Sequence, residues 1–287
     1  MATINATEDF SAIVTVRPPS DGFDTSSFFS KTKSQAFSPI DEFLKNAVSL
    51  NKLWTATDGE IEEQLANLVL LGYVSAVESY MRSLIRSLII IDPLVQKKCE
   101  SLQVSYTAAI HHRKTLLPEA LLEETVFSGK DKIISSLTKY LDLSKPTGSL
   151  GTLLDRYEAI CQMRHCCVHR FGKLGVKNAI ALGLDGHKSL IEKPVALDKN
   201  DLSQIADSLF SLVKSINNQV FAHVLQRLVG EDKSTFHWTW DYSIDKKMFF
   251  KYYNVFKSKE DAIKSPSANV LYKRFKNSKA PKDKRNS

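Results

Sequence analysis

Residues 65–93 read LANLVLLGYVSAVESYMRSLIRSLIIIDP, and this stretch decides the fold class. Apolar residues recur every three or four positions from Ile61 onward, which is the period of an α-helix with one buried face. TDGE at 57–60 precedes the pattern and Asp92-Pro93 ends it, because the residue before a proline is disfavoured in the helical conformation. The stretch therefore predicts a single long helix that ends before this proline.

Further helices are expected on both sides of this stretch. Ser38-Pro39 begins a helix that runs to about Trp54, because serine can cap the first free amides and proline is tolerated in the first turn. Helical periodicity after residue 93 predicts further helices over 94–103, 108–117, 118–127, 130–141, 152–169 and 202–229.

One short segment departs from this helical pattern. Ala179–Gly183 and Ser189–Val195 are short apolar runs on either side of Asp185-Gly186, which is a hairpin-type turn signal. They predict a small β-hairpin before the last long helix. The expected fold is therefore all-α, a helical bundle with a β-hairpin insertion.

The chain is expected to divide into an irregular arm over 1–37 with one short strand at Phe10–Arg17, a helical domain over 38–232, and a C-terminal extension over 233–287. From Ser234 onward there are 13 Lys and Arg against five Asp and Glu, whereas the first 233 residues hold 26 and 27. The extension also carries 11 of the 27 aromatic residues. Its last dozen residues are polar and are expected to be disordered. A basic, aromatic extension favours a polyanionic partner, with nucleic acid first.

The remaining composition favours a cytoplasmic protein without a membrane partner. The best apolar run, Leu84–Ile91, contains Arg86 and falls short of the roughly 18 uncharged residues that span a bilayer. The N-terminus lacks the basic and apolar regions of a secretory signal. Three of the four cysteines lie within seven residues, at 161–167, which favours reduced thiols over a disulfide framework.

The most informative stretch for function is RHCCVH at 164–169, at the end of the helix expected over 152–169. An arginine binds phosphate through a planar fork, and a histidine exchanges a proton near neutral pH. On a helix His165 and His169 share a face, and Arg164 lies about 100° round from His165. This arrangement suits RNA cleavage without a metal. His169 exchanges a proton with the 2′-hydroxyl or the leaving 5′-oxygen, Arg164 neutralises charge on the scissile phosphate, and His165 orients the phosphate, a water or the ring.

Two other interpretations of the same residues remain open. Cys161, His165 and His169 are also a set of ligand types that zinc accepts, although no standard zinc spacing is present. A fourth ligand would come from His111, His112 or Cys99. Alternatively, the histidines are simply polar residues at a helix C-terminus, where a positive charge is mildly favoured.

The pattern Arg164-x4-His169, with polar His165 after the arginine, resembles the R-polar-x3-H motif of the HEPN superfamily. Leu70–Ile85, which contains Glu78, is similar to the glutamate-bearing helix of its RiboL-PSP and MAE-type branches. VHRFG at 168–172 matches their VH-x-x-G ending. The resemblance covers about residues 40–230, and it departs at His165, where the family more often has Asn or Asp.

The resemblance implies a metal-independent endoribonuclease that needs no cofactor and leaves 2′,3′-cyclic phosphate and 5′-hydroxyl ends. It also implies a homodimer with two motif helices facing one cleft, acting as a toxin or an antiviral-defence effector with an antitoxin or defence-system partner. Arg164 and His169 would be catalytic, His165 would support them, and Glu78 would orient Arg164. The alternative function is a non-catalytic HEPN module that binds RNA, a nucleotide or a protein partner.

Other charged and aromatic side chains have expected roles outside the motif. Glu78 and Arg82 are one helical turn apart and are expected to form an ion pair. The aromatic residues Trp238, Trp240, Phe249 and Phe250 are expected to pack on the helical core. The candidates for RNA contact are Arg170, Lys246, Lys247, Lys251, Arg274 and Lys276.

Overall fold

The structure is a computed structural model that describes the chain except residues 1–12, 20–21, 33–34, 112–115, 231–236 and 281–287. The chain forms two units, residues 1–36 and residues 37–287. In the first unit, the described residues form one short 3-10 helix, η1 (Thr25–Phe28), capped by Asp24. Residues 13–17 do not form the strand expected at Phe10–Arg17, and the start of that segment lies outside the described residues.

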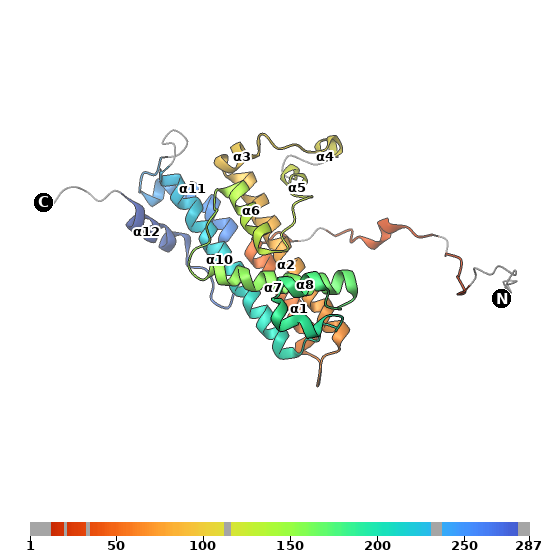
Figure 1. The fold of residues 1–287 in the computed structure, drawn as a ribbon. Helices are drawn as coiled ribbons and strands as arrows, with labels where there is room; N and C mark the ends of the chain where they lie inside the picture. Colours follow the sequence, from red (N-terminus) through yellow and green to blue (C-terminus); the bar gives the residue numbers. More distant parts are fainter. Residues whose placement is uncertain (1–12, 20–21, 33–34, 112–115, 231–236, 281–287) are drawn as a thin grey trace. The chain divides into compact units, whose positions relative to one another are not determined.

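The second unit is all-α in its described part, which confirms the predicted fold class, and Figure 1 shows the arrangement of its helices. The predicted helix over 118–127 is wrong beyond its first turn, because only a four-residue helix forms there. The helices are α1 (Pro39–Thr55), α2 (Glu63–Ile91), α3 (Pro93–Cys99), α4 (Tyr106–His111), α5 (Leu117–Ala120), α6 (Lys130–Leu141), α7 (Leu150–Arg170), α8 (Val176–Ala181), α9 (Leu184–His187), η2 (Lys188–Leu190), α10 (Lys199–Gly230), α11 (Tyr242–Phe256) and α12 (Ala268–Lys279).

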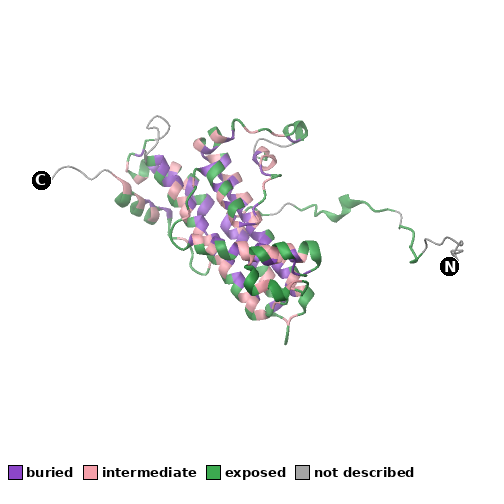
Figure 2. Ribbon diagram, in the orientation of Figure 1, coloured by how far each residue is buried: buried purple, intermediate pink, exposed green. Residues whose placement is uncertain are grey.

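The core forms where α2 packs against α1, α7 and α10. Figure 2 shows buried residues concentrated along these helices. On α2 the side chains of Val74, Val77 and Leu84 are fully buried, and each such side chain contributes about 1.5–3 kcal/mol relative to remaining exposed. One buried ion pair also joins α10 to the start of α3, with Arg227 Nη2 2.6 Å from Asp92 Oδ2.

Helix α2 is also the one described helix that is long and apolar enough to cross a membrane by length and composition. Buried positions make up 56% of its most apolar window. This burial is the pattern of a core helix, whose apolar face meets other helices.

The predicted β-hairpin is wrong. Residues 179–181 belong to α8, Asp185-Gly186 lies inside α9, and residues 188–190 form η2. Ala179 packs with Cys166 and Leu174 in a small separate core, and a helical turn provides that contact as well as a strand would. The only bridge among the described residues pairs Lys173 with Pro194. Short apolar runs are compatible with both a strand and a helical turn, so the sequence pattern predicted strands where helical turns form.

The C-terminal extension belongs to the same unit as the helical domain, through α11 and α12. Trp238 and Phe249 are buried, while Trp240 and Phe250 pack partly buried against the core, so the predicted packing of these aromatic residues is confirmed. The expected disorder of the last dozen residues is wrong for residues 276–279, which are in α12, whereas residues 281–287 lie outside the described residues.

Candidate functional site on α7

The motif lies on the last two turns of α7, whose earlier turns anchor it to the core. Leu154 and Tyr157 are fully buried, so the helix is fixed by its apolar face. Beyond them, Arg164 and His165 are half-buried and His169 is exposed. The imidazole centroids of His165 and His169 lie 6.1 Å apart with the rings inclined by 45°. The four-residue spacing therefore places both rings on one face, as predicted.

Arg164 makes no hydrogen bond or ion pair within the described part of the chain. Its charge nevertheless acts on its surroundings: burial raises the pKa of both Tyr157 and Cys161, and the positive charge of Arg164 opposes part of that rise. A half-buried guanidinium without an ion-pair partner among the described residues is suited to bind an anion from outside the protein.

His165 has a lowered pKa, first because of its burial and then because of the positive charges of Arg164 and His169. Lys177 on α8 lowers the pKa further, and Glu158 opposes the shift. Near neutral pH the ring is therefore neutral, and it can accept a hydrogen bond from a hydroxyl group at the same site.

Glu78 is half-buried on α2, and its carboxylate accepts a hydrogen bond from the Ser128 hydroxyl. Burial is the main cause of the raised pKa of Tyr157 and Cys161, and the negative charge of Glu78 adds to it at the same two groups that Arg164 influences. The two charges thus lie around one buried Tyr–Cys pair, and among the described residues no direct bond joins them.

The expected ion pair between Glu78 and Arg82 is not formed. Arg82 instead donates to the carbonyl oxygens of Leu122 and Thr125, the latter over 3.1 Å. These carbonyls lie in the turn after α5, where the Leu122 carbonyl also accepts from the Thr125 amide over 2.9 Å. The arginine therefore bonds to this turn, and Glu78 bonds to Ser128.

Two thiols of α7, those of Cys161 and Cys167, are protonated near neutral pH. Burial raises the pKa of Cys161 to about 12 and that of Cys167 to about 11. The Cys167 thiol donates to Asn67 Oδ1 over 3.4 Å. The described residues contain no group of three His, Cys, Asp or Glu side chains that could hold a metal ion, and His112 lies outside them.

A polar network that the sequence analysis missed holds α8 against the motif helix. Glu158 accepts hydrogen bonds from the Lys130 backbone amide over 2.8 Å and from Gln162 Nε2 over 2.7 Å. Asn178 Nδ2 on α8 donates to Gln162 Oε1 over 2.8 Å. This network could have been found from spacing in the sequence. Polar residues at positions i, i+4, i+7 and i+11 share one face of a helix, and here they are Glu158, Gln162, His165 and His169.

An apolar surface adjoins the end of the motif helix. Phe171, whose φ is +50°, ends α7 and is 84% exposed, while Leu68 on α2 is 64% exposed. Both line a cavity of about 250 Å³ with Cys167 and Gly172. Val168, within the motif, is 47% exposed. Large apolar side chains gathered in this way mark a surface that can be covered by another molecule.

The candidate RNA-contact residues differ in the partners that they already have within the chain. Arg170 Nη2 donates to both carboxylate oxygens of Glu192, over 2.7 and 2.8 Å, and this ion pair closes the loop after the motif. Lys276 Nζ donates to the Trp240 carbonyl over 2.5 Å. Lys246, Lys247 and Lys251 are exposed on α11.

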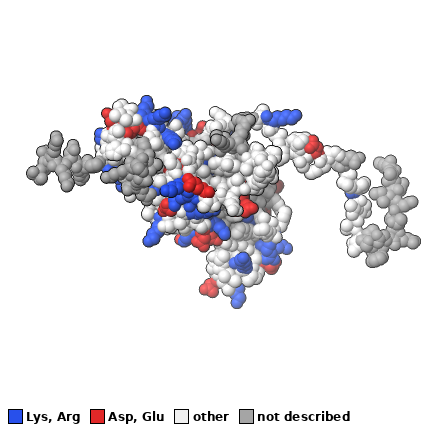
Figure 3. All heavy atoms as spheres, turned by 90° about the horizontal axis from the view of Figure 1, so that it is seen from above, with Lys and Arg blue, Asp and Glu red and all other residues white. Residues whose placement is uncertain are grey.

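The structure does not bring the basic extension next to the motif. Figure 1 draws α11 and α12 well apart from α8, which directly follows the motif. On the face seen in Figure 3, basic and acidic side chains are interspersed and do not form a continuous basic stripe. Arg274 lines a separate cavity beside α10.

No family model, curated protein or solved structure matches this chain.

Proposed function

We propose that the protein is a metal-independent endoribonuclease of the HEPN type, with Arg164 and His169 as its catalytic residues. The observation that carries the proposal is the half-buried Arg164, which has no bonded partner among the described residues, beside two imidazoles at an accessible helix end. A bound phosphate would provide the anion that Arg164 lacks. Helix α7 is packed on the core and bonded to α8, and both contacts would hold the Arg164 side chain and the imidazoles in place.

In the proposed reaction the ribose 2′-oxygen attacks its own phosphorus. A new oxygen–phosphorus bond forms, the bond to the 5′-oxygen breaks, and the products are a 2′,3′-cyclic phosphate and a 5′-hydroxyl. The proton of the 2′-hydroxyl leaves and the 5′-oxygen gains one, and His169 exchanges a proton with one of these oxygens. Arg164 stabilises the charge that develops on the phosphate, and neutral His165 orients the substrate by accepting a hydrogen bond from a ribose hydroxyl group.

We further propose a homodimer in which two motif helices face each other. Support comes from the exposed side chains of Leu68, Val168 and Phe171, because burying them against a second copy would remove apolar surface from water beside the motif. An antitoxin or a defence-system protein is the alternative occupant of this surface. The proposed setting is the cytoplasm, as a toxin or an antiviral-defence effector.

The second candidate function is a non-catalytic module that binds RNA or a protein partner. The observation that favours it is the separation between the motif and the exposed lysines of α11, because RNA bound along α11 would not be presented to the motif of the same chain.

Incubation of the purified protein with tRNA and total RNA in EDTA, followed by mapping of the ends, distinguishes these functions. Cyclic-phosphate ends are expected from the wild type. His169→Ala should lose roughly 10²–10⁴-fold in rate, the usual contribution of a proton-transfer group. Arg164→Ala should lose roughly 10²–10³-fold, as when one charge-stabilising donor is removed.

Arg156→Ala is the matched control, since Arg156 is exposed on the same helix two turns earlier. It should cleave like the wild type. RNA binding without cleavage by the wild type would support the non-catalytic module instead.

A further inference from the structure

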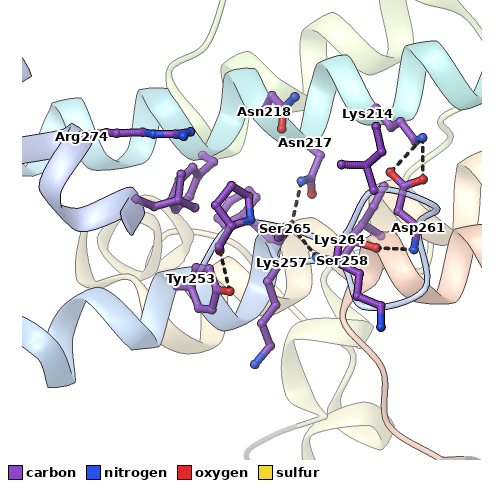
Figure 4. Close-up of a pocket in the computed structure, with 16 residues that line it drawn as sticks. Lys214, Asn217, Asn218, Tyr253, Lys257, Ser258, Asp261, Lys264, Ser265 and Arg274 are labelled. Carbon is purple, nitrogen blue, oxygen red and sulfur yellow. Dashed lines mark hydrogen bonds and ion pairs between the residues drawn. The ribbon is translucent and has the colours of Figure 1, made fainter. Parts of the chain in front are cut away.

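A second candidate site lies away from the motif, in a cavity of about 420 Å³ between α10, the end of α11 and α12. Lys214, Asn217, Asn218 and Phe221 line it from one face of α10, at positions i, i+3, i+4 and i+7. The loop between α11 and α12 forms the opposite wall (Figure 4). The volume falls within the range of roughly 300–1,000 Å³ that is typical of small-molecule sites.

This loop is anchored firmly, so the cavity is preformed. The carboxylate of Asp41, which is 4% exposed, accepts hydrogen bonds from the Ser258 hydroxyl over 2.6 Å and from the amides of Lys259 and Glu260. Across the loop, the Ser258 amide donates to the Ser265 hydroxyl over 2.8 Å. A preformed wall reduces the ordering cost of binding a ligand.

The cavity is positively charged. Its lining contains four basic side chains and one acidic side chain, Asp261, which pairs with Lys214 over 2.9 Å. Lys257 donates to Asn254 Oδ1 over 2.6 Å, and Figure 4 shows it pointing away from α10. Arg274 is exposed, and within the described residues it has no hydrogen-bond or ion-pair partner. Its side chain extends along α10 in Figure 4.

The lining also offers an apolar surface. Phe221, Leu271 and Pro266 contribute to it, and Ile263 in the loop is 87% exposed at the cavity. An exposed isoleucine beside other apolar side chains is suited to contact a flat ring. Asn218, one turn from Phe221 on α10, is exposed and carries an amide without a bonded partner among the described residues.

We propose that this cavity binds a phosphorylated small molecule of mononucleotide size. Arg274 binds the phosphate with its guanidinium fork, Asn218 donates a further hydrogen bond, and the ring lies against Phe221 and Ile263. The excess of positive charge around the cavity matches a phosphate dianion better than a carboxylate. The enclosing loop favours a small ligand over a strand, for which a continuous basic stripe would be expected. This site is independent of the motif on α7 and of RNA cleavage.

Isothermal titration calorimetry of the full-length protein with AMP tests the proposal. Adenosine and inorganic phosphate, each of which carries only part of the AMP molecule, are titrated for comparison. Saturable AMP binding is expected, at least tenfold tighter than the binding of either adenosine or inorganic phosphate. Arg274→Ala and Asn218→Ala should each weaken AMP binding, Arg274→Ala by at least tenfold. Lys273→Ala is the matched control, because Lys273 is exposed on α12 next to Arg274 but does not line the cavity.

Circular dichroism of each variant establishes that it is folded. The proposal is overturned if AMP gives no saturable heat at millimolar concentration. It is equally overturned if Arg274→Ala binds AMP as the wild type does, or if only a single-stranded RNA ten nucleotides long binds.

Discussion

Single basic residues differ in whether another group of the chain already pairs with them, and this decides which of them can bind an anion. Arg170 is paired with Glu192 and Lys276 with a carbonyl, whereas Arg164 has no such partner in the described part of the chain. Three basic residues that look alike in the sequence therefore differ in what they can still bind. Spacing places residues on a helix face, but partners such as Glu192, 22 positions away from Arg170, come from tertiary contacts that spacing does not report.

The pKa of His165 is a direct test of this placement. Arg164→Ala should raise it, because removal of a nearby positive charge makes protonation of the ring easier, while burial still keeps it below the usual value of 6.5. An NMR titration of the histidine ring protons measures this change, with Arg156→Ala as the control. An unchanged pKa in Arg164→Ala would contradict the position of Arg164 beside the ring.

The lowered pKa of His165 also determines how its contribution to folding stability changes with pH. Folded His165 binds its proton more weakly than the unfolded chain does. Its contribution to stability is therefore fully present above about pH 6.5, the unfolded pKa, and is lost as the pH falls below that value through the lower pKa of the folded state.

At the scale of elements, helix length decided what could be predicted. Long helices such as α2 and α10 repeat the apolar period over many turns, so their positions follow from the sequence alone. The six residues of α8 are too few to separate a helical period from an alternating one, and a strand was predicted there. The face of α7 that carries the motif was predictable, whereas its contact with Asn178 was not, because that contact depends on where α8 packs.

The end of α7 provides a test at this scale. Gly172 has a φ of +92°, and an added Cβ there would lie 3.4 Å from Asn67 Nδ2. Gly172→Ala should therefore destabilise the protein by about 1–2 kcal/mol, the cost of a left-handed conformation for a residue with a side chain. Urea unfolding followed by circular dichroism measures this loss.

Gly151→Ala is the matched control, because Gly151 lies in the first turn of α7 with open space around it. It should leave stability unchanged or raise it by up to about 1 kcal/mol, since alanine favours a helix more than glycine does. Equal effects of the two substitutions would contradict the strained helix end.

At the scale of the whole molecule, the proposed dimer follows from exposed apolar surface beside the motif. Phe171→Glu should shift the protein from dimer to monomer, because it places a charge within the surface that the second copy would cover. Sedimentation equilibrium measures this change. Ile244→Glu is the control, since Ile244 is 65% exposed on α11, away from the motif. A wild type that is monomeric at all concentrations would contradict the dimer.

A cleavage assay with His169→Ala tests the proposed ribonuclease activity most directly. We predict that wild-type protein in EDTA produces RNA fragments with 2′,3′-cyclic phosphate ends, and that His169→Ala loses this activity by at least roughly a hundredfold while remaining folded. Cleavage by His169→Ala at the wild-type rate, with the same ends, would contradict it.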